Sequence, residues 1–352
     1  MGRYTKKVCE GMEIFVGIDM HKTSWHVTIM SDPGEVWHGN IPGEWEVLKK
    51  VLDHYPGCRI HAVYEAGCFG YWLYDRIVEY GATCIVTPPS LVPMEYGNRV
   101  KTDRRDSKKL ACLLQKDLLK NVHVPTEEAR SHRQVFRQRR QLIEDRVKAQ
   151  HRIKSALLFF GIEIPEQTGA FSRSYMDRLR KIRFSNRIHD RSFRILLDEY
   201  DHFSDQLERH TGLIREIAAL DTYRDRMALL TSIPGIGMLT AIEILVELQD
   251  VSRFQSPEQL AAYLGLTPSQ YSTGEKVHMG HITKVGKSHL RATLIEASWR
   301  LVRHDAKARA FYEQLRARAG SKRAIVAVAR RLIIQIRKML LSNSPYSGKA
   351  AA

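Results

Sequence analysis

The first 125 residues alternate between apolar runs typical of strands and segments with helical spacing, and this alternation constrains the fold more than any other feature. Residues 13–19 (EIFVGID) form a run typical of a buried strand, and residues 24–30 (SWHVTIM) alternate as an antiparallel neighbour would. Antiparallel strands followed by strand–helix alternation predict a mixed sheet flanked by helices. Further strands are expected at 35–41, 59–66 and 82–89, and helices at 44–54, 69–81 and 107–119.

Acidic side chains stand at the ends of two of these apolar runs. Asp19 ends the first strand, and Glu65 ends the strand at 59–66 in the same way. A carboxylate at the end of a buried strand is costly unless it is paired or bound to a cation. Asp103 and Asp106 follow three positions apart, which places both on one face of a helical turn. Four converging carboxylates predict an all-oxygen site for Mg²⁺ or Mn²⁺.

The second acidic pair lies within a strongly basic stretch, residues 101–109 (KTDRRDSKK), where a polyanion would meet two carboxylates. Bound divalent ions resolve this conflict, because they turn an acidic pair into a phosphate-binding one. Two such ions about 4 Å apart stabilise the attacking and leaving oxygens in phosphoryl transfer. Lys101, Arg104 and Arg105 would then hold the nucleic-acid backbone. The alternative is that the four acids are unrelated helix caps, strand-end caps and surface residues.

The overall charge favours a nucleic-acid partner. Lysine and arginine number 55 against 39 aspartates and glutamates, a formal net charge of +16, and such an excess most often meets a polyanion. The five cysteines show no metal-binding or redox spacing, so we expect reduced core thiols in a cytoplasmic, DNA-associated protein. We expect neither a membrane span nor a secretory signal, because no run has the required length and apolar character.

The composition changes near residue 126, where the first domain is expected to end. From residue 130 to residue 154 the chain carries nine lysines and arginines against two acids, with apolar positions at roughly helical spacing. We expect a long basic helix here, a partner helix at about 192–220 and a loop at 163–176. Together they predict an antiparallel helical hairpin or coiled coil.

This predicted hairpin occupies residues 126–225, and its basic helix is a candidate contact for RNA or DNA backbone. A solvated helix face in an ordinary bundle is the alternative. The residues selected for contact are Arg137, Arg139 and Arg140.

Residues 226–352 are predicted to be mostly helical with glycine punctuation and form the third expected domain. Residues 232–241 (SIPGIGMLTA) have the pattern of a helix-hairpin-helix turn. Gly235 and Gly237 would let the backbone approach a phosphate, and amides at the next helix start would bind it. A plain helical turn is the alternative.

Two adjacent hydroxyl side chains, Ser272 and Thr273, precede Gly274 in what we expect to be a loop. A hydroxyl there attacks a phosphodiester if its proton is removed and the developing charge is offset. Basic side chains that follow are candidates for that offset: Lys276, Lys284 and Arg291. On spacing alone, an ordinary Ser-Thr-Gly turn is the alternative.

Together these segments resemble the DEDD insertion-sequence transposases, also described as bridge-RNA-guided recombinases, and their relatives, the Piv-like DNA invertases. The resemblance spans nearly the whole chain. In the N-terminal part it rests on VGIDMHK, YEAGCFGYWL and VKTDRRDSKKLA, and in the C-terminal part on SIPGIGMLTA, LAAYLGLTPSQYSTG and GHITKVGKSHLR. The motifs occur in the expected order and at the expected separations.

The resemblance implies a RuvC-like domain of RNase-H fold (residues 1–125), a coiled-coil segment and a C-terminal transposase domain. It implies that Asp19, Glu65, Asp103 and Asp106 form a Mg²⁺-binding tetrad, and that a serine joins DNA through a phosphoserine. It also implies a structured non-coding RNA that pairs with donor and target DNA. The expected assembly is a homo-oligomer, a dimer or tetramer, with active sites that combine domains from different subunits.

The register of the nucleophile is open, because in some family members the serine stands directly before the glycine. Here Thr273 holds that place and Ser272 is one residue earlier. We select Ser272, since a primary hydroxyl is less hindered, and keep Thr273 in reserve. The competing functions are a hydrolytic nuclease such as a junction resolvase, a Piv-like invertase and a non-catalytic nucleic-acid-binding protein.

Overall fold

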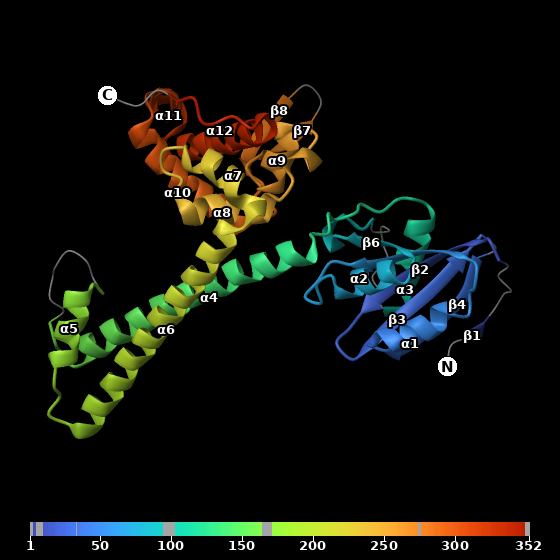
Figure 1. The fold of residues 1–352 in the computed structure, drawn as a ribbon, viewed down its shortest axis with the longest axis horizontal. Coiled ribbons are helices and arrows are strands. Elements are labelled where there is room, and N and C mark those ends of the chain that lie inside the picture. The colour runs from blue at the N-terminus through green and yellow to red at the C-terminus, as the bar shows by residue number, and fades with distance from the viewer. Residues whose placement is uncertain are drawn as a thin grey trace. The chain divides into compact units, whose positions relative to one another are not determined.

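The computed structural model describes residues 3–4, 10–32, 34–93, 103–163, 171–273 and 276–348 of the chain. The chain divides into two compact units, Met1–Pro125 and Thr126–Ala352 (Figure 1). Each unit has a hydrophobic core of its own. The first unit is a mixed α/β structure and the second is mostly helical. This confirms the predicted fold class at that level.

A six-stranded sheet with the strand order β1-β4-β3-β2-β5-β6 forms the first unit. The strands are β1 (Arg3–Tyr4), β2 (Glu13–Met20), β3 (Ser24–Ser31), β4 (Gly34–Pro42), β5 (Arg59–Glu65) and β6 (Thr83–Thr87). β3 is antiparallel to both of its neighbours, β2 and β4, whereas β5 runs parallel to β2 and to β6. This order is compatible with an RNase-H-like domain.

Helices cover both faces of the sheet because the apolar side chains of β2 and β5 point to both sides. On one face, Ile14, Val16 and Ile18 share a core with Leu48 and Leu73. On the other face, Val63 packs with apolar side chains of the third helix. The helices are α1 (Trp45–Leu52) and α2 (Trp72–Glu79) on the first face and α3 (Asp103–Gln115) on the second.

Gly17 brings α3 into close contact with the centre of β2. A β-carbon at this position would lie 2.1 Å from the carbonyl oxygen of Ser107 and 2.5 Å from the amide nitrogen of Ala111. The Ser107 hydroxyl is also 2.9 Å from the hydroxyl of Thr28 on β3. The start of α3 is therefore fixed against the sheet near the end of β2. Helix α3 begins four residues before the expected start, at Asp103.

The long basic helix of the second unit is α4 (Glu127–Phe159), and its partner is α6 (Arg187–Ala219). Arg139 contacts Thr211 whereas Arg152 contacts Glu199, so the two helices run antiparallel, side by side, as Figure 1 shows. Both helices are longer than predicted. The expected loop at 163–176 is wrong in part, because α5 (Arg173–Lys181) begins within it and is capped by the Ser172 hydroxyl.

The C-terminal helices form one core with the end of α6. Ile214 of α6 packs in the same cluster as Leu230, Ile244, Leu294 and Ile333. The helices are α7 (Asp221–Thr231), α8 (Met238–Leu248), α9 (Pro257–Tyr263), α10 (Ser288–His304), α11 (Ala306–Ala319) and α12 (Ser321–Ser342). Among the described residues, no helix combines the length and apolar character needed to cross a membrane.

A two-stranded antiparallel hairpin interrupts these helices and was not predicted. β7 (Pro268–Thr273) pairs with β8 (Lys276–Ile282). The expectation of core thiols holds for Cys84, which is buried, but is wrong for Cys68, which is exposed.

Candidate functional site

Asp19 and Glu65 lie side by side at the carboxyl ends of neighbouring parallel strands. Ile18 of β2 is paired with Tyr64 of β5, so the next residue on each strand is one of the two acids. Because side chains alternate along a strand, Asp19 is on the same face as Gly17, the face that α3 covers. The parallel register therefore places both acids at the same end and on the same face of the sheet.

The imidazole of His21 lies between the carboxylates of Asp103 and Asp19. The Nε2 atom of His21 is 3.4 Å from Oδ2 of Asp19 and 3.4 Å from Oδ2 of Asp103. His26, which is paired with Asp19 across β2 and β3, places Nδ1 3.6 Å from the same oxygen of Asp103. Segments distant in sequence thus meet at one point, where β2 ends and α3 begins.

Asp106 is close enough to influence Asp19 electrostatically. Burial raises the pKa of Asp19, and the negative charges of Asp103 and Asp106 raise it further, while His21 and His26 lower it. The carboxyl group is therefore held where its ionised form is penalised. A cation bound between these acids would relieve the penalty.

A metal ion fits this group of donors. One ligand atom each from Asp19, His21 and Asp103 lie within 4.8 Å of one another, which is the spread expected of ligands around one small ion. Asp106 is half-buried on the same helical turn as Asp103, and Glu65 is exposed beside Asp19. The structure thus places all four predicted acids at one end of the sheet.

The two histidines were missed by the sequence reasoning. Signals for both were present: His21 is two residues after Asp19 in IDMHK, and His26 is at an alternating position of the next strand. Neither signal distinguishes a ligand from a surface histidine, because the turn after β2 places His21 and the β2–β3 pairing places His26.

The basic residues around α3 are partly paired within the protein. Arg104 lies 3.7 Å from Glu35, and Lys108 lies 2.8 Å from the same carboxylate. Burial raises the pKa of Glu35, but the Lys108 hydrogen bond and charge lower it overall. Arg105 is exposed. Lys101 lies outside the described residues.

Basic residues of α4 differ in what they contact. Arg137 is exposed, whereas Arg139 is half-buried and donates to the hydroxyl of Thr211. Burial lowers the pKa of the Arg139 guanidinium. Arg140 is exposed and pairs with Glu144. Part of the charge excess of α4 is therefore matched by acids within the unit.

A buried ion cluster that the sequence reasoning missed joins α4, α8 and the start of α10. Glu247 is 2% exposed, and its carboxylate lies 3.2 Å from Lys287, 3.6 Å from His289 and 3.7 Å from Arg133. Burial alone raises the pKa of this carboxyl, but the histidine hydrogen bond and the two cations lower it to about 2. The cluster fixes α10 at the point where the hairpin returns to the helical core.

Gly235 in the turn between α7 and α8 has a structural explanation. Its φ is +94°, and a β-carbon there would lie 2.6 Å from Cβ of Arg300 and 3.0 Å from the carbonyl oxygen of Ala297. The glycine is therefore required by packing on α10. A β-carbon at Gly237, which caps α8, would meet no atom within 4 Å. That this turn binds a phosphate stays a prediction.

Ser272 and Thr273 are the last two residues of β7, so the expected loop at this position is instead the end of a strand. Ser272 pairs with Val277 and Thr273 with Lys276. The main chain of the prospective nucleophile and of its immediate neighbours in β7 is thus paired with β8, although the register shifts between Pro268 and Gln270.

Hydrogen bonds from Arg291 connect the segments at the base of this hairpin to the helical core. Arg291 is buried and donates to the carbonyl oxygens of Leu264 at 2.6 Å and Lys284 at 3.2 Å. Its guanidinium nitrogens are used inside the fold, which explains this residue without a nucleic acid. Lys284 itself is exposed and has a φ of +56°.

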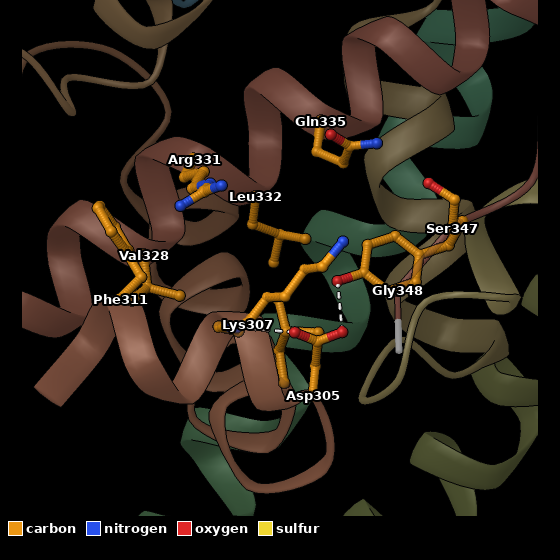
Figure 2. A pocket seen from close by; sticks show the side chains of 12 residues that line it. Asp305, Lys307, Phe311, Val328, Arg331, Leu332, Gln335, Ser347 and Gly348 are labelled. Atoms are coloured by element: carbon orange, nitrogen blue, oxygen red, sulfur yellow. Dashed lines mark hydrogen bonds between the residues drawn. The ribbon is translucent and has the colours of Figure 1, made fainter. Parts of the chain in front are cut away.

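A cavity of about 170 Å³ in the second unit is lined by α10, α11, α12 and the C-terminal segment (Figure 2). Its carboxylate, Asp305, caps α11 through the amide of Ala308 and accepts a hydrogen bond from Tyr346 at 3.0 Å. The lining includes none of the predicted site residues that the structure describes. We assign the polar groups of this cavity to folding.

Comparison with known proteins gives two matches to family models. Residues 227–313 match the model described as "Transposase IS116/IS110/IS902 family". Residues 16–161 match a model described as "Transposase", the DEDD transposase of IS110 elements. The second match contains Asp19, Glu65, Asp103 and Asp106, and the first contains Ser272.

Individual relatives agree with these matches. "Putative transposase y4qE" of Sinorhizobium fredii is 31% identical over 84% of this chain and 73% of its own length. The "Transposase for insertion sequence element IS1533" of Leptospira borgpetersenii is 24% identical over 96% of this chain and 98% of its own length. The "Transposase for insertion sequence element IS1111A" of Coxiella burnetii is 26% identical over 94% and 90%.

Proposed function

This chain belongs to the IS110 family of insertion-sequence transposases, enzymes that cleave and join DNA, and we propose that it acts as an RNA-guided recombinase with a phosphoserine intermediate. The proposal assigns the divalent cation, Mg²⁺ or Mn²⁺, to the tetrad of Asp19, Glu65, Asp103 and Asp106. It assigns the nucleophile to Ser272.

One observation carries the catalytic part of the proposal. The side chains of Asp19 and Asp103 lie close together although the two residues are far apart in the sequence. Asp106 acts on the same carboxylate, and Glu65 follows Tyr64 on the neighbouring strand. Acids this close together repel one another unless a cation is present. The arrangement is therefore better explained by metal binding than by folding.

A bound divalent ion supplies Lewis-acid polarisation of the scissile phosphate and offsets charge in the transition state. In the proposed reaction, the hydroxyl oxygen of Ser272 forms a bond to phosphorus and the bond to the leaving DNA oxygen breaks. The serine proton is lost and the leaving oxygen gains one. The liberated hydroxyl of the partner strand then attacks the phosphoserine and restores the serine. The ester conserves the energy of the broken bond, so no ATP is needed.

Nucleic-acid contacts are proposed for basic residues whose side chains are exposed to solvent. Arg105, Arg137 and Lys284 are exposed in the structure and suit backbone contact, which needs charge accessible to solvent. Arg104 and Arg140 remain in the proposed set, since surface ion pairs are weak and exchange readily. Lys276 joins the set on its place in the hairpin sequence.

The proposed partners are donor DNA, target DNA and a structured non-coding RNA that pairs with both. The net charge of +16 supports polyanionic partners in general, and the resemblance to bridge-RNA-guided recombinases supports the RNA in particular. A homo-oligomer, a dimer or tetramer, is proposed on the same resemblance.

The test is a trapping experiment with the full-length chain, labelled donor and target DNA, the RNA of the element and Mg²⁺. After denaturation, labelled DNA is expected on the peptide that contains Ser272, with no adduct in Ser272→Ala and a normal adduct in Thr273→Val. A label on Thr273 would move the nucleophile by one residue. Cleavage without an adduct, retained in Ser272→Ala, would favour a hydrolytic nuclease instead.

The RNA requirement is tested in the same assay by leaving out the RNA or scrambling its pairing loops. Adduct formation is expected to fall in both cases. An unchanged yield would contradict RNA guidance while leaving the phosphoserine chemistry intact. DNA binding that ignores Mg²⁺, with no strand breakage, would contradict the enzymatic proposal as a whole.

A further inference from the structure

His21 occupies the centre of the acidic group in the first unit. Its Nε2 atom is equally distant from one oxygen of Asp19 and one oxygen of Asp103, at 3.4 Å each. Its own amide donates to the carbonyl oxygen of Ser24 at 3.0 Å, which closes the turn between β2 and β3. The hydrogen-bonded turn thus fixes the backbone of His21 at a position from which its imidazole reaches both carboxylates.

These separations are those of ligands that share one ion. Oxygen and nitrogen ligands lie about 2.0–2.1 Å from ions such as Mg²⁺ and Zn²⁺, so adjacent ligand atoms are roughly 2.8–3.0 Å apart in octahedral geometry and roughly 3.3–3.4 Å apart in tetrahedral geometry. The distances from His21 to Asp19 and Asp103 match the upper end of these values. A nitrogen donor is therefore placed where the sequence predicted oxygen donors alone.

We propose that Nε2 of His21 is a direct ligand of the divalent cation held by Asp19 and Asp103. This inference rests on the proposed function, because it concerns the same metal centre. It changes the chemistry of that centre from an all-oxygen site to a mixed nitrogen and oxygen site. Imidazole binds transition-metal ions more readily than Mg²⁺, which prefers oxygen ligands and retains its waters. The site is therefore expected to prefer Mn²⁺ to Mg²⁺.

His26 provides a matched control within the same site. Its Nδ1 atom lies 3.6 Å from Asp103, but the group of mutually close ligand atoms consists of Asp19, His21 and Asp103. We assign His26 a charge interaction with the Asp103 carboxylate, a role that supports a ligand without contacting the ion. Comparing His21→Gln with His26→Gln therefore distinguishes the loss of a metal ligand from the loss of a residue that only contacts a ligand.

The test is Mn²⁺ binding by the full-length chain, measured by titration and by pulsed electron paramagnetic resonance, which detects a directly bound nitrogen. The wild type is expected to bind Mn²⁺ with a nitrogen coupling, and His26→Gln to retain that coupling. His21→Gln is expected to lose the coupling and to bind Mn²⁺ at least about tenfold more weakly, with a smaller change for Mg²⁺. His21 is half exposed, so the fold should tolerate the change, which circular dichroism verifies.

The outcomes separate this inference from the proposed function. Mn²⁺ binding through oxygen alone, abolished by Asp19→Asn, would overturn the role of His21 and preserve the metal centre. A nitrogen coupling that survives in His21→Gln or disappears in His26→Gln would also overturn it, because the ligand would then be another residue. Absence of any Mn²⁺ binding in the wild type would overturn both the ligand and the centre.

Discussion

Two groups of charged side chains in the described part of the protein are built in opposite ways. In the second unit, Glu247 is buried and surrounded by Arg133, Lys287 and His289, and its pKa is lowered to about 2. In the first unit, Asp19 faces other acids and its pKa is raised. One carboxylate is paired with an arginine and a lysine inside the fold, whereas the neighbours of the other are histidines and further acids.

This contrast indicates that Glu247 has a structural role, whereas Asp19 has a role in binding a ligand. A buried acid with matched cations contributes to folding, and its loss leaves those cations unpaired. An acid whose ionised form is penalised in the folded protein contributes nothing comparable, and such acids are concentrated at binding and catalytic sites. Substitution of each acid by its amide should therefore have opposite effects on stability and on activity.

The largest expected effect is on activity, at Asp19. Asp19→Asn should lower recombination by about a thousandfold or more, because losing a metal ligand removes several kcal/mol of transition-state stabilisation. The same variant should be at least as stable as the wild type, since it removes a carboxylate that burial and like charge disfavour. Strand-exchange rates and thermal melting of one preparation test both parts. A variant that loses activity by unfolding would contradict the comparison.

Glu247 should show the reverse behaviour. Glu247→Gln leaves Arg133 and Lys287 with a reduced countercharge in a buried site, which costs about 3–5 kcal/mol when a buried pair is broken. Denaturant unfolding measures this loss, and Glu258→Gln at an exposed position of α9 is the matched control. Mn²⁺ binding by the folded variant should be unchanged. A loss of stability no larger than that of the control would show that the cluster does not support the fold.

The same carboxylate predicts a pH dependence. The folded pKa of Glu247, about 2, is below its ordinary value of 4.5, so its stabilisation is present above pH 4.5 and is lost as the pH falls towards 2. The full contribution is on the order of 3 kcal/mol. The difference in unfolding free energy between wild type and Glu247→Gln should therefore shrink between pH 4.5 and 2. If this difference in unfolding free energy did not change with pH, the stabilisation would not come from the ionised Glu247 carboxylate.

The sequence allowed much of the first region to be predicted and little of the second. Asp19 and Glu65 could be placed together because each ends an apolar strand, and parallel strands end at a common edge. The position of His21 depends on the turn that follows β2, and no periodicity encodes it. Gly17 appeared as an ordinary strand residue, although the contact with α3 requires it.

Long-range partners explain what was missed in the second unit. Arg133 belonged to a basic run that was interpreted as a nucleic-acid surface, but its guanidinium donates to the carbonyl oxygens of Val246 and Glu247. Arg291 similarly contacts Leu264. A cation on a helix carries the same local signal whether it meets phosphate or a carbonyl oxygen more than twenty residues away, so charge counts cannot distinguish the two.

The smallest predicted effect concerns this distinction on a single helix, where Arg137 is exposed and Arg139 bonds to Thr211. Arg137→Ala should reduce the slope of log affinity against log salt by about one unit, because one phosphate contact with its released counterion is lost. Arg139→Ala should leave the slope nearly unchanged and lower the melting temperature instead. Binding of the RNA or DNA at several salt concentrations measures the slope. Equal slopes for both variants would mean that exposure on α4 does not identify the nucleic-acid contacts, and that the basic helix is matched by acids of α6 rather than by phosphate.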